Sequence, residues 1–375
     1  MNFQPLTNFL NSLPDKGVPG TDCIVYHKGQ KVYRHQSGYL DIEKKVPMSP
    51  SALYNIYSAT KPVTCVAALK LYEQGLYKLS DPLYAYIPEY KNMHIEENGD
   101  LHKAEKPILI RDLFTMTAGF DYNIRSKSIA RVKKETNGLA PTLQVVRGFA
   151  EEPLSFEPGT HWQYSLCHDV LGGLIEVLSG KTLGEYCKQH IFGPLGMQHS
   201  SFLVTKEIDE QLAPMYMHYP EENITKQISS QNIFRFGSLY ESGGAGMISS
   251  VDDYIRFADM LARGGRTIDN ELILSKSTIE LMRTNQLSAE ILPDFNYPHM
   301  QGYGYGLGVR TLIDKEKSDS IGSLGEFGWG GAAGAYVLAD PKEELAVYYA
   351  QHMLESMEVY IHPRLRNLIY QGLHG

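Results

Sequence analysis

Ser58 and Lys61 are spaced so that their side chains can act together. Three residues are just under one helical turn, so the two side chains share a face if a helix begins here. The start of a helix also offers free backbone N–H groups and a partial positive charge. A serine nucleophile needs such surroundings, namely a proton acceptor and donors for a developing oxyanion. A serine that only caps a helix gives the same pattern, so other segments of the chain must show whether Ser58 is a nucleophile.

The residues after Ser58 predict the helix that positions this pair. Apolar residues recur at helical spacing and give the helix one apolar face: Val63, Val66, Ala67 and Leu71. Pro62 lies in the first turn, where proline is tolerated, and Gly75 is typical of a C-terminal stop.

Two further segments could complete a site. Residues 156–165 contain a Pro-Gly turn followed by Tyr164, a phenol that could take part in proton transfer. Residues 328–334 are rich in glycine and contain Trp329-Gly330-Gly331 followed by Ala332. Glycines in such a segment leave room for a substrate to lie along a strand.

Together with Ser58-x-x-Lys61, these two segments resemble the serine β-lactamase and penicillin-binding-protein superfamily. The chain is most similar to its class C β-lactamase-like branch, and within it to the esterases called family VIII carboxylesterases. The similarity covers almost the whole chain and includes residues 54–57, 113–119 and 242–247. Three motifs in the right order are specific, although each alone is loose.

Strand patterns near both ends of the chain suggest one shared sheet. Residues 23–26 and 31–33 flank a predicted hairpin turn, and residues 335–338 and 345–349 flank another. Residues 303–310, in which glycine alternates with larger residues, also read as strand. The resemblance implies an α/β (α+β) fold of the β-lactamase/transpeptidase type, with an antiparallel sheet flanked by helices. We expect residues 1–75 and 237–375 to form an α/β sandwich domain, residues 76–236 a mostly helical inserted domain, and the active site to lie at their junction.

The chain departs from the class C pattern in two motifs. Tyr164-Ser165-Leu166 keeps the tyrosine of Tyr-x-Asn but not the asparagine, while the literal match at Tyr90 lacks the preceding Pro-Gly turn. Trp329-Gly330-Gly331 stands where Lys-Thr-Gly is usual. A lysine there would attract the carboxylate of a β-lactam, whereas tryptophan offers an apolar wall and one N–H donor. This replacement favours neutral acyl esters.

The chemistry and the resemblance together assign roles to these residues. Ser58 attacks the carbonyl and becomes acylated, with Tyr164 as general base and Lys61 keeping it ionised. Either group needs a pKa shift of about 3 units, roughly 4 kcal/mol, to act at pH 7, and neighbours titrate as a pair. The resemblance places the oxyanion hole at the backbone N–H groups of Ser58 and Ala332. The expected substrate-binding residues are Trp329, Gly330 and Gly331.

Composition and charge exclude several classes of partner. A net charge of −8 argues against nucleic acid or an anionic membrane surface. Neither a Cys-x-x-Cys pair nor a His-Glu-x-x-His motif is present, so no metal or other cofactor is expected. No apolar stretch is long enough to span a bilayer, and the start of the chain does not resemble a secretory signal. We therefore expect a cytoplasmic protein, unless a leader has been removed.

The predicted function is hydrolysis of small-molecule carboxylic esters, or of amides, through an acyl-Ser58 intermediate. Two alternatives stay open. One is a β-lactamase or D-Ala-D-Ala carboxypeptidase, against which the lost Lys-Thr-Gly argues. The other is a non-catalytic sensor or scaffold of the same fold, which the missing asparagine after Tyr164 favours. Residues 121–140 and 288–300 are expected to form loops that shape the substrate pocket.

Overall fold

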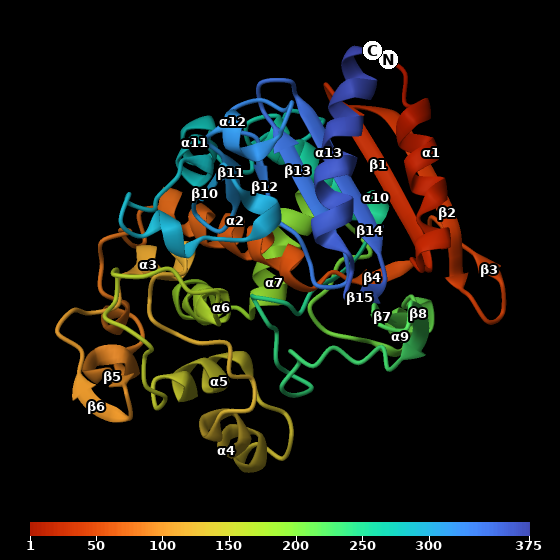
Figure 1. Ribbon diagram of the computed structural model, residues 1–375. Coiled ribbons are helices and arrows are strands. Elements are labelled where there is room, and N and C mark those ends of the chain that lie inside the picture. The colour runs from red at the N-terminus through yellow and green to blue at the C-terminus, as the bar shows by residue number, and fades with distance from the viewer.

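The computed structural model describes all of residues 1–375, and an eight-stranded sheet occupies its upper part in the view of Figure 1. The strand order is β10-β11-β12-β13-β14-β1-β2-β3, and every neighbouring pair is antiparallel. The sheet joins the two ends of the chain, since β1 pairs with β14 along its whole length. The strands are β1 (Gly20–His27), β2 (Gln30–Asp41), β3 (Val46–Pro47), β10 (Tyr303–Tyr305), β11 (Arg310–Leu312), β12 (Phe327–Gly328), β13 (Tyr336–Asp340) and β14 (Leu345–Gln351).

Both predicted hairpins are present. Lys28 and Gly29 connect β1 to β2 with positive φ values of 52° and 72°, as a two-residue turn matched to the strand twist requires. The segment 303–310 differs from a continuous strand, because it divides into β10 and the start of β11. A tight turn makes the break: the Gly306 N–H donates to the Val309 carbonyl at 2.8 Å, and Gly308 has a φ of +84°.

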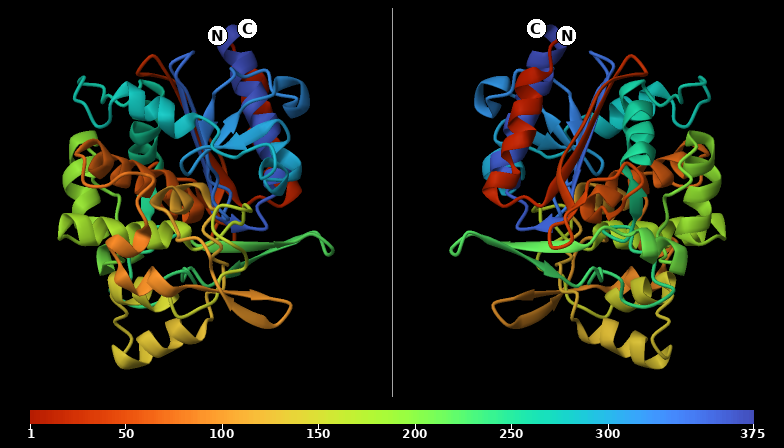
Figure 2. Two further views of the ribbon diagram at one scale, coloured as in Figure 1. Left: turned by 90° about the vertical axis from the view of Figure 1, so that its left-hand side faces the viewer. Right: turned by 90° about the vertical axis from the view of Figure 1, so that its right-hand side faces the viewer.

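Helices cover both faces of the sheet (Figure 2). On one face, α1 (Gln4–Ser12) packs against α13 (Glu358–His374), so the two chain ends lie together. On the other face, α10 (Val251–Ala262) lies along β14, β13 and β1. Leu6 and Leu10 of α1 and Leu365 of α13 are completely buried in this packing. The antiparallel sheet flanked by helices, which the family resemblance implied, is therefore confirmed.

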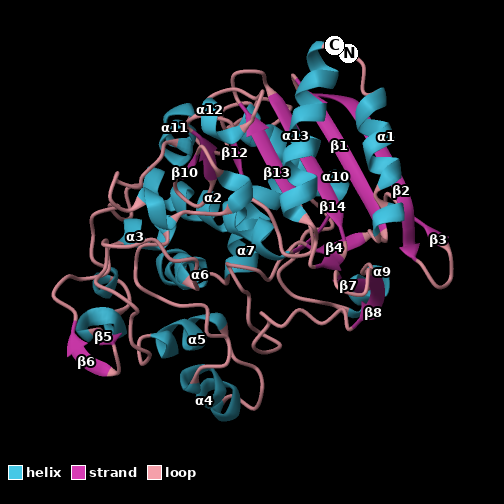
Figure 3. Ribbon diagram, viewed as in Figure 1, coloured by secondary structure: helices cyan, strands magenta, loops and turns pink.

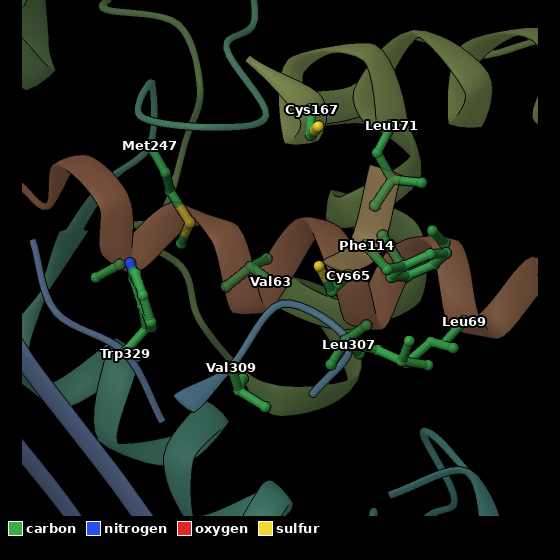
Figure 4. Packing of buried hydrophobic residues seen from close by; sticks show 14 of the residues in the cluster. Val63, Cys65, Leu69, Phe114, Cys167, Leu171, Met247, Leu307, Val309 and Trp329 are labelled. Carbon is green, nitrogen blue, oxygen red and sulfur yellow. The ribbon is translucent and has the colours of Figure 1, made fainter. Parts of the chain in front are cut away.

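The helix α2 (Thr60–Glu73) follows a single 3-10 turn, Tyr57–Ala59, and runs through the middle of the molecule. It contacts α6 (Cys167–Ser179), and buried side chains such as Phe114, Leu171 and Leu307 surround it (Figure 4). The sequence predicts one apolar face, but α2 is buried on nearly all sides. Its polar residues Lys61 and Thr64 are consequently buried as well.

The region 76–236 is rich in helix and loop and lies below the sheet in Figure 3. It also contains two hairpins that the sequence analysis did not anticipate, β5 (His94–Glu97) with β6 (Asp100–Lys103) and β7 (Met215–Tyr219) with β8 (Ile224–Ile228). One apolar cluster of 80 residues runs through both this region and the sheet. The division into two domains at residues 75/76 and 236/237 stays a prediction.

The remaining helices are α3 (Ile110–Thr115), α4 (Lys127–Glu135), α5 (Thr142–Phe149), α7 (Leu183–Cys187), α8 (Gly193–Leu195), α9 (Lys206–Gln211), α11 (Lys276–Arg283) and α12 (Lys315–Ser318). The remaining strands are β4 (Leu53–Asn55), β5 (His94–Glu97), β6 (Asp100–Lys103), β7 (Met215–Tyr219), β8 (Ile224–Ile228), β9 (Ile248–Ser250) and β15 (Met353–Leu354). None of the helices combines the length and the hydropathy that a bilayer-crossing segment needs.

Candidate active site

Ser58, Lys61 and Tyr164 meet at the start of α2. The Lys61 Nζ lies 3.1 Å from the Ser58 Oγ, and the Tyr164 hydroxyl donates to the same oxygen at 2.6 Å. Lys61 is one turn of helix from Ser58, whereas Tyr164 comes from the segment that leads into α6. The three residues predicted to be catalytic are therefore in mutual contact around one oxygen atom.

A strained turn places Ser58 at this point. Tyr57 has a φ of +46°, in the left-handed region that bulky residues seldom adopt. Its ring is buried and packs edge-on against Phe234 at 6.2 Å, which holds the conformation. The preceding strand β4 is anchored by pairing with β9. Backbone strain of this kind is common where a nucleophile is presented to a cavity.

Lys61 lies in a closed polar pocket within the core. The side chain has no solvent exposure, and its Nζ donates to the Tyr122 hydroxyl at 3.2 Å and to the Gly244 carbonyl at 2.8 Å. Burial lowers the pKa of Lys61 to about 7, although the nearby Asp169 carboxylate acts in the opposite direction. A substantial fraction of the amine is thus neutral at pH 7.

Asp169 forms a polar network behind Lys61. The Tyr240 hydroxyl donates to its carboxylate at 2.8 Å and the Ser242 hydroxyl at 2.6 Å. The backbone of Gly244 packs directly against this carboxylate, since a Cβ there would lie 2.4 Å from the Asp169 Oδ2. The glycine-rich segment 242–247 can therefore approach near enough for its carbonyl to bind Lys61. Asp169 also lies in the first turn of α6, where an acidic side chain stabilises the helix N-terminus.

Tyr164 is held between two aromatic rings. Tyr122 stacks on one side with ring centroids 5.4 Å apart, and Trp329 stacks on the other at 5.8 Å. The Trp329 indole N–H also donates to the Tyr164 hydroxyl oxygen at 3.4 Å. Burial raises the pKa of Tyr164 above its ordinary value, more than these hydrogen bonds lower it. The phenol is consequently protonated at neutral pH.

Tyr122 is a site residue that the sequence analysis missed. It contacts both Lys61 and Tyr164 from the loop after α3. The analysis expected the loop from residue 121 to shape the pocket, but no local pattern distinguishes Tyr122 from the other 24 of the 25 tyrosines in the chain.

A cavity of about 180 Å³ opens in front of the Ser58 hydroxyl. Every residue that was predicted to bind substrate or to stabilise an oxyanion lines it. Further lining residues come from the predicted loop 288–300 and from the start of α13. The complete lining is Ser58, Tyr164, Tyr297, His299, Met300, Trp329, Gly330, Gly331, Ala332 and Glu358.

The segment 328–334 forms a tight loop beside the Ser58 turn. The Gly334 N–H donates to the Gly331 carbonyl at 2.7 Å, which closes the loop. A Cβ on Gly331 would lie only 2.2 Å from the Ile56 carbonyl oxygen, so glycine is needed for this close approach. The loop thereby carries Ala332 to the same cavity as Ser58. The oxyanion-binding role of their backbone N–H groups stays a prediction.

Tyr90, of the literal Tyr-x-Asn match, and His168 of α6 are both buried in the interior of the protein. Tyr90 is buried away from Ser58, and its hydroxyl donates to the Val146 carbonyl at 2.5 Å. His168 is fully buried with its Nε2 3.3 Å from the Phe114 carbonyl oxygen, and burial lowers its pKa to about 3. Neither residue lines the cavity in front of Ser58.

An antiparallel sheet flanked by helices, with a Ser-x-x-Lys pair at the start of a central helix, defines a β-lactamase-like fold. Comparison with known families agrees with this class. Residues 6–369 match the family described as Beta-lactamase, and the chain belongs to this family. The predicted superfamily is thus confirmed over nearly the whole length of the chain.

Individual relatives are similar over almost their full lengths. Protein Rv1367c of Mycobacterium tuberculosis (strain ATCC 25618 / H37Rv) is 32% identical over 362 residues, which cover 93% of this chain and 90% of that protein. Esterase EstB of Burkholderia gladioli is 26% identical over 390 residues, covering 98% and 90%. Among solved structures, EstCE1, described as a hydrolase with promiscuous acyltransferase activity, has a TM-score of 0.81 at 24% identity, and 98% of each chain is covered. This structural similarity supports the fold.

Proposed function

We propose that the protein is a serine hydrolase that cleaves carboxylic esters through an acyl-Ser58 intermediate. The observation that carries the proposal is the double contact of the Ser58 Oγ, 3.1 Å from the Lys61 Nζ and 2.6 Å from the Tyr164 hydroxyl, at the edge of a cavity. A nucleophile beside a proton acceptor is the arrangement that acyl transfer requires. The similarity to Esterase EstB supports ester hydrolysis within this family.

Lys61 is the better proton acceptor in this arrangement. A neutral amine has two N–H donors and one lone pair. Tyr122 and Gly244 take the two donors, which leaves the lone pair for the Ser58 hydroxyl proton. The sequence analysis assigned the base to Tyr164, but burial lowers the pKa of Lys61 to about 7 and raises that of Tyr164. We therefore assign the base to Lys61 and the acid to Tyr164.

The reaction then follows two balanced steps. Lys61 takes the proton as the Ser58 Oγ attacks the ester carbonyl, and the oxyanion is bound by the backbone N–H groups of Ser58 and Ala332. Tyr164 gives its proton to the leaving alkoxide oxygen, and the proton on Lys61 replaces it. A water molecule attacks the acyl group in the second step, with the same groups moving its protons, and frees the acid and Ser58.

The cavity favours neutral substrates. Trp329 presents an apolar wall with a single N–H, and that N–H already donates to Tyr164. No lysine or arginine lines the cavity to pair with the carboxylate of a β-lactam. The neutral acyl ester is therefore preferred over the β-lactam alternative.

Kinetics with two chromogenic substrates test the proposal. We expect kcat/KM for a short-chain p-nitrophenyl ester to exceed that for nitrocefin, and Ser58→Ala to lose at least about 10³-fold on the ester. Faster turnover of nitrocefin would establish the β-lactamase alternative. A folded wild type that turns over neither substrate, nor any member of a panel of esters and peptide-like amides, would favour the scaffold.

The cysteines bear on the compartment in which the protein acts. All four are buried and unpaired. Free thiols persist in reducing compartments, so we place the protein in the cytoplasm.

A further inference from the structure

A compact cluster at the edge of the cavity is formed by His299, Glu358 and His362. Their ligand atoms all lie within 4.8 Å of one another. His299 and Glu358 line the cavity that holds Ser58, and His362 is buried beneath them with 4% exposure. The proton transfers proposed for ester hydrolysis use none of these three side chains.

Two elements bring the three side chains together. Glu358 and His362 are four residues apart on α13, so they share one face of that helix. His299 belongs to the short 3-10 turn Pro298–Met300, which packs directly against α13. The sequence analysis found no metal motif because the cluster is completed by a residue from a distant loop.

The cluster contains polar atoms without protein partners. Both ring nitrogens of His299 are buried and form no hydrogen bond. Burial raises the pKa of Glu358, with repulsion from Glu355 as the second cause, and no hydrogen bond or positive charge opposes the shift. An unsatisfied buried polar group destabilises the folded state, so such groups in a folded protein require an explanation.

His362 is already oriented as a ligand would be. Its Nε2 lies 3.4 Å from the Gly334 carbonyl oxygen, and its ring packs against Tyr336 at 4.7 Å. A histidine that ligates a metal through one nitrogen usually donates its other N–H to a carbonyl or carboxylate. The Gly334 carbonyl belongs to the loop 328–334, so the cluster is connected to the loop that carries Ala332.

We propose that His299, Glu358 and His362 bind one divalent transition-metal ion of the Zn²⁺ type at the wall of the substrate cavity. Two imidazoles and one carboxylate are a ligand set that zinc accepts, with a further position open. Because His299 and Glu358 face the cavity, the open position faces it too. Ligands of tetrahedral zinc lie roughly 3.4 Å apart, given metal–ligand distances of about 2.0–2.2 Å. Binding therefore draws the side chains together from their present spacing.

Two positively charged side chains near the cluster oppose the binding of a cation. Arg310 and Arg366 both act on His299 and His362. The guanidinium groups are partly neutralised, since Arg310 lies 3.8 Å from the buried Glu326 carboxylate. Glu358 supplies the negative charge that offsets the remainder, so its carboxylate should be as important for binding as the imidazoles.

Calorimetric titration of the tag-free, metal-stripped protein with Zn²⁺ tests the proposal. We expect one equivalent to bind, and His299→Ala and Glu358→Gln each to weaken binding by at least about 10-fold. The matched control is His161→Ala, which removes an exposed histidine 3.0 Å from Asp294 and should bind like wild type. Circular dichroism verifies that each variant is folded.

Co²⁺ provides a second measurement on the same proteins, because its visible absorption reports tetrahedral coordination by protein ligands. No saturable binding to wild type, or equal binding to wild type and both cluster variants, would overturn the proposal. Neither readout needs turnover, so failure of the metal site and failure of the proposed esterase function are distinguishable.

Discussion

The buried amine of Lys61 makes the stability of the protein depend on pH. Burial lowers its pKa in the folded state to about 7, against 10.5 for the ordinary side chain. Between these two values the unfolded chain holds a proton that the folded protein does not. Raising the pH therefore stabilises the folded state through this window, and below about pH 7 the destabilising effect is constant.

The size of the effect follows from the two pKa values. The difference between about 7 and 10.5 corresponds to about 5 kcal/mol of destabilisation when the unfolded side chain is fully protonated. Each pH unit in this window adds about 1.4 kcal/mol to the free energy of unfolding, and less close to pH 7 where the folded side chain is still partly protonated. From pH 7 to pH 9, Lys61 alone should therefore raise the free energy of unfolding by about 2 kcal/mol. Lys61→Met removes the titrating group and with it this increase.

Urea unfolding at pH 7, 8 and 9 measures the increase directly. The absolute stability of Lys61→Met combines lost hydrogen bonds with relief from burying an amine, so the informative quantity is the pH slope. Wild type should gain about 2 kcal/mol more than Lys61→Met over this range. Ser58→Ala keeps the buried amine and is the matched control, with a slope like wild type. Equal slopes for wild type and Lys61→Met would refute the lowered pKa and the assignment of Lys61 as base.

Three further predictions concern catalysis. The kcat/KM for an ester should rise with pH through about 7, because only neutral Lys61 accepts the serine proton; a rise centred well above pH 9 would instead indicate ionised Tyr164. Tyr164→Phe keeps the stacked ring but removes the acid. Steady-state assays with an ester should therefore show kcat/KM lower by about 10²–10⁴-fold, with little change in the midpoint of thermal unfolding. Gly331→Ala places a Cβ 2.2 Å from the Ile56 carbonyl oxygen and should cost about 1–3 kcal/mol in unfolding experiments, while Gly330→Ala, whose nearest neighbour is at 3.3 Å, should change stability less.

Local chemistry predicted the parts of the fold that depend on few residues. The turn at Lys28 and Gly29 needs positive φ at two positions, and the glycine at the second position is the residue that signals it in the sequence. Gly75, which the sequence predicts as the stop of α2, has a φ of +74° just beyond the last helical residue Glu73, the left-handed conformation typical of a helix C-terminus. The family resemblance rests on the order of the motifs. It predicted that Ser58 and Tyr164 lie together in space although they are far apart in the sequence.

Other features depend on long-range packing and leave no local signal. The periodicity of α2 suggests a single apolar face, yet its neighbours enclose it on nearly all sides and make Lys61 a buried amine. Tyr122 reaches Lys61 from a loop whose path no spacing rule determines. His299 joins Glu358 in the same way, from a second loop. Burial and loop position therefore decide both the proton acceptor and the proposed metal site.

Mass spectrometry of the protein after reaction with a fluorophosphonate tests the central claim most directly. The account predicts one adduct per chain, located by peptide sequencing on Ser58, and no adduct on folded Ser58→Ala. Labelling of a different residue, or an unlabelled wild type that still hydrolyses esters, would contradict it.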